Sequence, residues 1–201
     1  MTTTRTRAVL VALTATAALA LTACGGNDDT TNGAPAATSA PATATAGAHN
    51  AQDVSFAQGM IPHHQQALEM AQLAADRASS AQVKDLAARI EKAQDPEINT
   101  MTGWLKAWGE DVPMAGMDHG GHAGMAGMMS DKDMTALKKA QGTDFDTMFL
   151  TMMVQHHQGA VEMAGTEKSK GDYAPATSMA DAIVTTQNAE IKEMNKLLGK
   201  G

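Results

Sequence analysis

The sequence predicts an all-α protein, a four-helix bundle built from two copies of one helical hairpin. Good helix formers dominate residues 51–201, and no stretch alternates polar and apolar residues as a half-buried strand does. A segment around two adjacent histidines occurs twice, 93 residues apart, and residues 53–71 match residues 146–164 at 10 of 19 positions. The same offset relates the segments that follow, so a whole hairpin is duplicated.

The predicted helices can be placed in order along the chain. The first hairpin covers about residues 51–109 and the second about 143–199, and a short extra helix lies in the connection. Ser130 and the acids after it are typical of an N-cap and first turn, so the extra helix begins there and stops near Gly142. The expected helices span residues 52–77, 81–108, 130–142, 143–170 and 173–198.

The equivalence of the two hairpins extends beyond the histidines. A single hairpin cannot bury its apolar face, whereas two can pack as a four-helix bundle with pseudo-twofold symmetry. The two histidine pairs are then expected to face a shared interior. At the same offset, identical residues recur in the second helix of each copy: Ile90 and Ile183, Gln94 and Gln187, Glu97 and Glu190, Ile98 and Ile191, and Met101 and Met194.

The N-terminal residues resemble the export signal of a bacterial lipoprotein. Arg5 and Arg7 precede an apolar run, and the segment ends at Cys24, the only cysteine. Residues 1–23 are therefore predicted to be a lipoprotein signal peptide that leaves Cys24 as the lipid-bearing first residue; the alternative is an ordinary signal peptide with an incidental cysteine. Residues 24–50, rich in Ala, Thr, Gly and Pro, predict a flexible tether. The domain would then be held at the outer face of the cytoplasmic membrane or elsewhere in the cell envelope.

Charge and composition exclude several classes of function. A net charge of −7 with 3% aromatic residues argues against a nucleic-acid partner and is compatible with soluble cations. With Cys24 lipidated, no thiol remains, so thiolate catalysis and cysteine-type zinc sites are excluded.

Methionine and histidine share one face of each duplicated helix. Residues three, four or seven apart lie on the same side of a helix, and His64 and His157 lie about 100° from that face. Imidazole and thioether ligands together suit Cu(I) best, and Ag(I) or Cu(II) next. We therefore predict a copper site, with at least one histidine of each pair as a ligand. The stripes consist of Met60, His63, Ala67 and Met70 in the first copy and of Met153, His156, Ala160 and Met163 in the second.

Core packing is the alternative interpretation of these side chains. Methionines at helical spacing usually fill cores, although burying four imidazoles without partners is costly. At least one histidine of each pair is expected to bind metal, and the other member of the pair could instead form a hydrogen bond with Glu97, Glu190 or a backbone carbonyl. Glu97 also follows Asp95-Pro96, which resembles a cap and first-turn proline, so its acid could instead serve the helix dipole.

Two other features of the duplicated helices have structural interpretations. Pro62 directly precedes the first histidine pair and predicts either a kink or the first position of a new helix. Asp53 and Asp146 precede the first histidine of each pair by ten residues, roughly 15 Å along a helix. We therefore expect these aspartates to be caps or inter-helix partners.

The connection between the hairpins carries a separate metal signal. Residues 113–129 hold five methionines and two histidines among glycines and alanines, which cannot build a core. A Met/His tract in an exported protein predicts a copper-collecting arm within the loop at 113–130; the alternative is a low-complexity linker. Its candidate ligands are Met114, Met117, His119, His122, Met125, Met128 and Met129.

The doubled motif Asp-x-x-Phe-x-x-x-Met-x-x-His-His-x-x-Ala-x-x-Met-Ala resembles the domain of unknown function 305 family over about residues 50–199. The resemblance implies a ferritin-like four-helix fold in exported bacterial proteins, some of them linked to periplasmic copper binding, and no established reaction. The chain departs from the di-iron ferritin pattern, because Glu69 is followed at i+3 by Gln72 and Glu162 by Gly165. The motif positions carried over are Met60, His63, His64, Met70, Met153, His156, His157 and Met163.

Three functions are compatible with the sequence. The leading hypothesis is a lipid-anchored protein that binds Cu(I) for sequestration, tolerance or transfer to and from a partner protein. A copper-dependent oxidase or di-metal hydrolase would need a general base, for which Glu69 or Glu162 are the candidates. The third is a metal-free structural or interaction lipoprotein.

Overall fold

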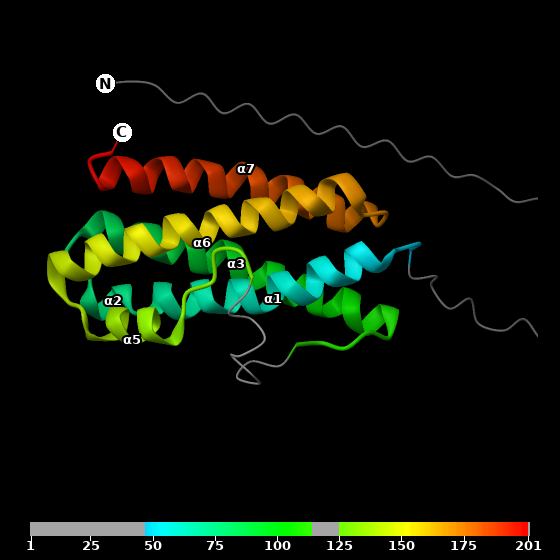
Figure 1. Cartoon of the computed structure of the whole chain (residues 1–201), viewed down its shortest axis with the longest axis horizontal. Coiled ribbons are helices and arrows are strands. Elements are labelled where there is room, and N and C mark those ends of the chain that lie inside the picture. Colours follow the sequence, from blue (N-terminus) through cyan, green and yellow to red (C-terminus); the bar gives the residue numbers. More distant parts are fainter. Residues whose placement is uncertain (1–46, 114–124, 201) are drawn as a thin grey trace, which may run out of the picture. The chain divides into compact units, whose positions relative to one another are not determined.

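Helices account for most of the part of the chain that the computed structural model describes, residues 47–113 and 125–200 (Figure 1). Within those residues the only β contact is an isolated bridge between Ala78 and Gly142. The predicted signal peptide, Cys24, most of the tether, and Met114, Met117, His119 and His122 lie outside the described residues. The helices are α1 (Ala51–Gln72), α2 (Ala74–Arg77), α3 (Ala81–Trp108), α5 (Asp131–Lys139), α6 (Gly142–Lys170) and α7 (Ala174–Leu197).

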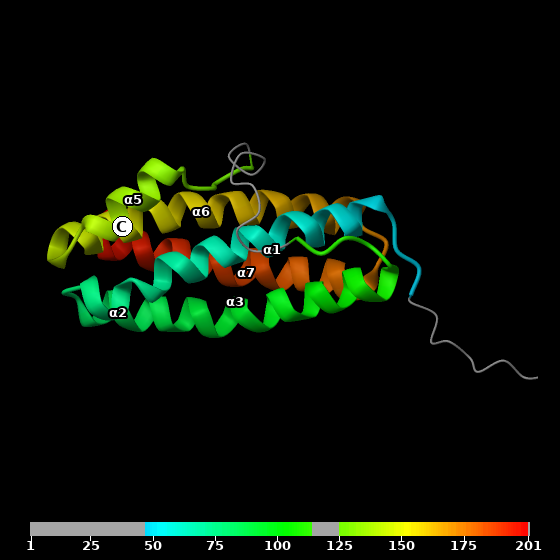
Figure 2. The same cartoon turned by 90° about the horizontal axis from the view of Figure 1, so that it is seen from below.

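The helices form two hairpins, and the first helix of one hairpin packs against the first helix of the other. Helix α1 packs along α3, and α6 packs along α7, while α1 and α6 contact each other across the centre of the bundle (Figures 1 and 2). The short helix α5 lies against α6. The predicted all-α class, the duplicated hairpins and the extra helix in the connection are confirmed, and the two helices that carry the histidine pairs are the ones that meet.

Side-chain caps define where several helices begin. Asn50 accepts hydrogen bonds from the backbone N–H groups of Gln52 and Asp53, and the Asp53 carboxylate accepts one from Asn50 in return. Ser130 and Asp133 form the same reciprocal arrangement at α5, as the sequence predicted. Helix α3 ends at Gly109, whose φ of 76° lies in the left-handed region that favours glycine.

One local prediction was wrong, and two alternatives left open by the sequence are excluded. The first helix is interrupted at Leu73, although the backbone there keeps helical angles (φ −66°, ψ −25°), so the interruption is confined to one residue. Pro62 does not begin a new helix, because α1 runs through it. Pro96 likewise lies inside α3, so Glu97 is not in a first turn. A proline removes one backbone N–H donor, and the helix can continue where the residues before and after the proline are held by packing.

The two aspartates of the repeat tie the hairpins to each other. Asp53 in α1 accepts hydrogen bonds from the backbone N–H groups of Asp172 (3.2 Å) and Tyr173 (3.0 Å), in the turn between α6 and α7. Asp146 in α6 accepts hydrogen bonds from Ser79 and Ser80, in the turn before α3. Each hairpin therefore stabilises the turn of the other, and the prediction of caps and inter-helix partners is confirmed.

The core consists of two apolar clusters. One cluster includes Phe145, Phe149, Leu86 and Ile90 and contains the buried Met70 and Met153. The other includes Phe56, Ile61, Leu105 and Ile183 and contains the buried Met60, with Met163 packed against it. The pseudo-twofold symmetry thus puts one methionine of each stripe into each cluster.

Candidate metal centre

Four imidazoles lie buried where α1 meets α6. His63, His64, His156 and His157 are all fully buried, with 0% of each side chain exposed. The rings of His63 and His156 face each other across the two hairpins, with centroids 3.8 Å apart and planes tilted by 39°. Helix α1 contributes one pair and α6 the other, so the shared interior expected from the repeat is present.

The second histidine of each pair is held by a carboxylate of its own hairpin. His64 Nε2 donates a hydrogen bond to Glu97 on α3, and His157 Nε2 donates one to Glu190 on α7, both at 2.7 Å. The two bonds are related by the repeat. They confirm the predicted role of the glutamates as histidine partners and explain why both copies retain them. In the neutral ring, this bond fixes the hydrogen on Nε2 and leaves the lone pair on Nδ1.

His63 and His156, the two facing histidines, which we call the inner pair, form fewer hydrogen bonds. His63 Nε2 lies 3.2 Å from the carbonyl oxygen of Ala126, to which it donates. Neither ring nitrogen of His156 has a hydrogen-bond partner among the described residues, and neither do the Nδ1 atoms of the other three histidines. Each unpartnered buried nitrogen costs free energy that an electron-pair acceptor at this point could recover.

Burial keeps the inner imidazoles neutral. Burial, followed by the charges of His64 and His157, lowers the pKa of His63 to about 3, against a smaller opposing effect of the Ala126 carbonyl. Burial and the neighbouring histidines also hold the pKa of His156 well below its ordinary value. Neutral imidazole is the form that binds metal, so these side chains fit a soft or borderline ion.

Histidine and carboxylate alone do not complete such a site. Among residues 47–113 and 125–200, no group of three or more His, Cys, Asp or Glu side chains is arranged to hold a metal ion. The stripe methionines, which could supply thioether ligands, lie on the same two helices as the histidines. Met60, Met70 and Met153 are fully buried in the apolar clusters, whereas Met163 is partly exposed.

The described end of the Met/His loop lies on the bundle beside the inner histidines. We call residues Met125–Met129 the arm end. Gln66 on α1 forms two hydrogen bonds with the backbone of the arm end. Its side chain donates to the Met129 carbonyl (2.9 Å) and accepts from the Met129 N–H (2.7 Å). The arm end also packs against Gly159 on α6, where a Cβ would overlap the Ala126 carbonyl oxygen. The contacts of Gln66 and Gly159 with the loop were not expected from the sequence, in which the loop is separate from the bundle.

Comparison with known proteins identifies the family of the chain. The family model described as domain of unknown function (DUF305) matches residues 53–198. The chain belongs to the DUF305 family. A DUF305 protein from Streptomyces coelicolor is 31% identical (TM-score 0.67, covering 74% of this chain and 93% of that one), and a DUF305 fragment from Deinococcus radiodurans is 32% identical (TM-score 0.68, 76% and 98%). CopM in its Cu(II)-bound form is 38% identical (TM-score 0.63, 72% and 94%), and CopM structures with Cu(I) and Ag are also similar. No curated protein matches the chain.

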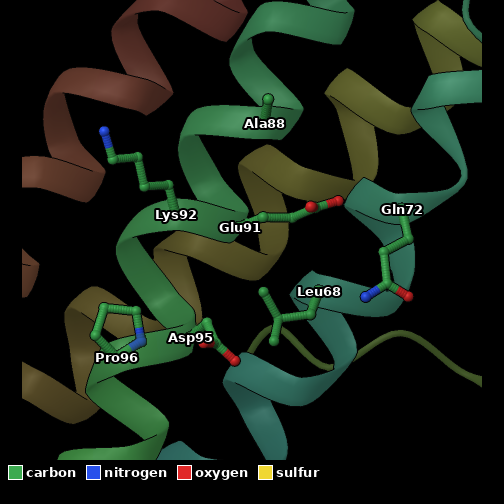
Figure 3. Close-up of a pocket in the computed structure, with 7 residues that line it drawn as sticks. All are labelled: Leu68, Gln72, Ala88, Glu91, Lys92, Asp95 and Pro96. Carbon is green, nitrogen blue, oxygen red and sulfur yellow. The ribbon is translucent and has the colours of Figure 1, made fainter.

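The two glutamates considered as a general base of this DUF305 protein lie away from the histidines. Glu69 and Glu162 are exposed, and Glu69 forms a 2.5 Å ion pair with Lys138 of α5. A groove between α1 and α3 has no histidine among its lining residues (Figure 3). Its lining residues are Leu68, Gln72, Ala88, Glu91, Lys92, Asp95 and Pro96.

Among the helices within residues 47–113 and 125–200, none is both long and apolar enough to cross a membrane.

Proposed function

We propose that this protein binds copper in the cell envelope, as Cu(I), through the buried histidines and the methionines beside them. The observation that carries the proposal is the cluster of four buried imidazoles, each with at least one ring nitrogen that has no hydrogen-bond partner among the described residues. Such a cluster is costly in a metal-free core and useful in a metal site. The CopM relatives bound to Cu(I), Cu(II) and Ag support the choice of metal.

The division of roles within the cluster follows from its hydrogen bonds. His156 has both nitrogens free, and His63 has Nδ1 free beside it, so these two are the first candidates for ligands. His64 and His157 present Nδ1, and their carboxylate partners would orient the rings and raise their basicity. Thioethers from the stripes and the arm would complete a coordination sphere that favours Cu(I) without any thiol.

A matched pair of leucine substitutions tests the proposal. His156→Leu removes both free nitrogens and breaks no hydrogen bond, so the metal-free variant should be as stable as the wild type or more so. Its affinity for Cu(I), measured by anaerobic competition with a chromophoric chelator, should fall sharply. His49→Leu is the control, because His49 stacks on Trp108 outside the cluster. Wild-type copper binding by His156→Leu would contradict the proposal.

Thermal unfolding gives an independent readout. A ligand that binds only the folded state stabilises it by about 2.7 kcal/mol when its free concentration is 100 times Kd. Cu(I) should therefore raise the melting temperature of the wild type and of His49→Leu but not that of His156→Leu. A metal-free structural role predicts no shift for any of the three proteins.

The proposed location in the cell envelope rests on the predicted signal peptide and on one of the similar proteins. The apolar segment in residues 1–23, followed by Cys24, supports export and lipid anchoring. The S. coelicolor relative has itself been described as a candidate secreted protein. In that setting the protein would sequester Cu(I), confer copper tolerance or exchange the ion with a donor or acceptor protein. Cys24→Ala should release the protein from the membrane fraction, and retention in that fraction would argue against the lipid anchor.

A further inference from the structure

Two thioethers converge over a helix position that has no side chain. Gly59 lies in α1, one turn before His63. A Cβ at Gly59 would lie 3.0 Å from the terminal methyl carbon of Met163 on α6 and 3.7 Å from the sulfur of Met125 in the arm end. Glycine disfavours a helix interior, and its presence here lets the ends of both methionines approach the α1 backbone.

His63, the first histidine of the α1 pair, lies one turn after Gly59. Residues four apart share a helix face, so His63 lies on the side of α1 that carries Gly59. Its Nε2 is 3.2 Å from the carbonyl of Ala126, the residue after Met125. The arm end therefore runs along this face, with its backbone at His63 and its thioether at Gly59.

The two copies of the repeat differ at the positions that this arrangement requires. Gly59 corresponds to Met152 in the second copy, which is 8% exposed and fills the equivalent position with its own side chain. Gln66, which grips the arm end, corresponds to Gly159, against which the arm end packs. The arm end thus makes one side of the pseudo-symmetric centre different from the other.

We propose that Met125, Met163 and His63 form an entry site for a soft monovalent cation, through which the ion reaches the buried histidines. Two thioethers and an imidazole suit Cu(I) or Ag(I) and suit hard cations poorly. Both methionines are partly exposed, whereas the histidines beyond them are fully buried. The inference rests on the proposed function and adds a path for the ion from the partly exposed thioethers to the buried histidines.

Displacing the end of Met163 tests the entry site without removing a ligand. Gly59→Ala puts a methyl group 3.0 Å from the terminal methyl carbon of Met163, so that flexible end must shift, and circular dichroism and thermal unfolding check that the variant is folded. Its affinity for Ag(I), measured by isothermal titration of the purified protein with silver nitrate, should fall roughly tenfold or more, as for a disturbed metal site. Gly103→Ala and Gly165→Ala are matched controls, because nothing lies within 4 Å of either added methyl.

Removing the sulfurs gives a second test. Met125→Leu and Met163→Leu keep the side-chain volume and remove the thioether, and each should also weaken Ag(I) binding. Met148→Leu is the control, since Met148 lines a surface hollow between α5 and α6. In wild-type protein with carbon-13-labelled methionine methyls, Ag(I) should shift the signals of Met125 and Met163 and leave that of Met148 in place.

The possible outcomes separate the two proposals. If Gly59→Ala and the two leucine variants bind Ag(I) as the wild type does while His156→Leu does not, the entry site is wrong and the histidine centre stands. If only the entry-site variants lose affinity for Ag(I), the entry site stands and the histidine centre is wrong. Wild-type binding by all of them would overturn both.

Discussion

Replacing Glu167 with glutamine is predicted to remove a pH-dependent penalty on the folded bundle. Glu167 in α6 is fully buried, near Asp53 at the start of α1. Burial, followed by the neighbouring Asp53 carboxylate, raises the pKa of Glu167 to about 7. Burial would also raise the pKa of Asp53, but hydrogen bonds, beginning with that from the Asn50 backbone, lower it below its ordinary value. Asp53 therefore stays ionised and favours a proton on Glu167.

The sign and size of the effect follow from the two states of the carboxyl. It titrates near 4.5 in the unfolded chain and near 7 in the folded one, so the folded protein holds the proton more tightly. The resulting stability is complete at low pH and is lost as the pH rises from about 4.5 to about 7. Since one pKa unit corresponds to about 1.4 kcal/mol, the loss between pH 5 and pH 8 is about 2.5 kcal/mol.

Urea unfolding at pH 5, 6.5 and 8 measures this loss. Glu167→Gln does not titrate, so its free energy of unfolding relative to the wild type should increase by about 2.5 kcal/mol across the range, a shift of roughly 1 M in midpoint. Comparing two proteins at each pH cancels the opposite contribution of His63, whose pKa burial lowers to about 3. The control is Glu162→Gln, an exposed position on the same helix. A difference that stays constant with pH for Glu167→Gln would refute the reasoning.

Three further variants have defined outcomes. Asp146→Ala leaves three donors of the turn before α3 without their acceptor, so the free energy of unfolding in urea should fall by about 2–3 kcal/mol. Glu97→Gln combined with Glu190→Gln should weaken Cu(I) binding about 10–100-fold in a chelator competition while leaving the helical circular dichroism unchanged. Gly159→Ala puts a methyl group into the backbone of the arm end, so the amides of residues 125–129 should lose protection in hydrogen exchange; unchanged protection would contradict the packing described here.

The repeat made most of the fold predictable. Periodicity and caps predicted the second helix over residues 81–108, and α3 has those bounds. Matching aspartates at a fixed distance from the histidines predicted structural ties rather than ligands, because ten residues of helix separate them from the site. The one-residue interruption at Leu73 has no signal in the sequence, since the backbone there stays helical and the surrounding residues are good helix formers.

The sequence by itself determined that two hairpins had been duplicated and that each carries a histidine pair on a helix of the bundle. It could not distinguish the two histidines of a pair, because adjacent residues differ only by a rotation of about 100° about the helix axis. Packing of α1 against α6 made His63 and His156 the facing pair, and contacts with α3 and α7 assigned His64 and His157 to their glutamates. The place of the arm end was likewise a tertiary result, since it depends on contacts of Gln66 with a segment 63 residues away.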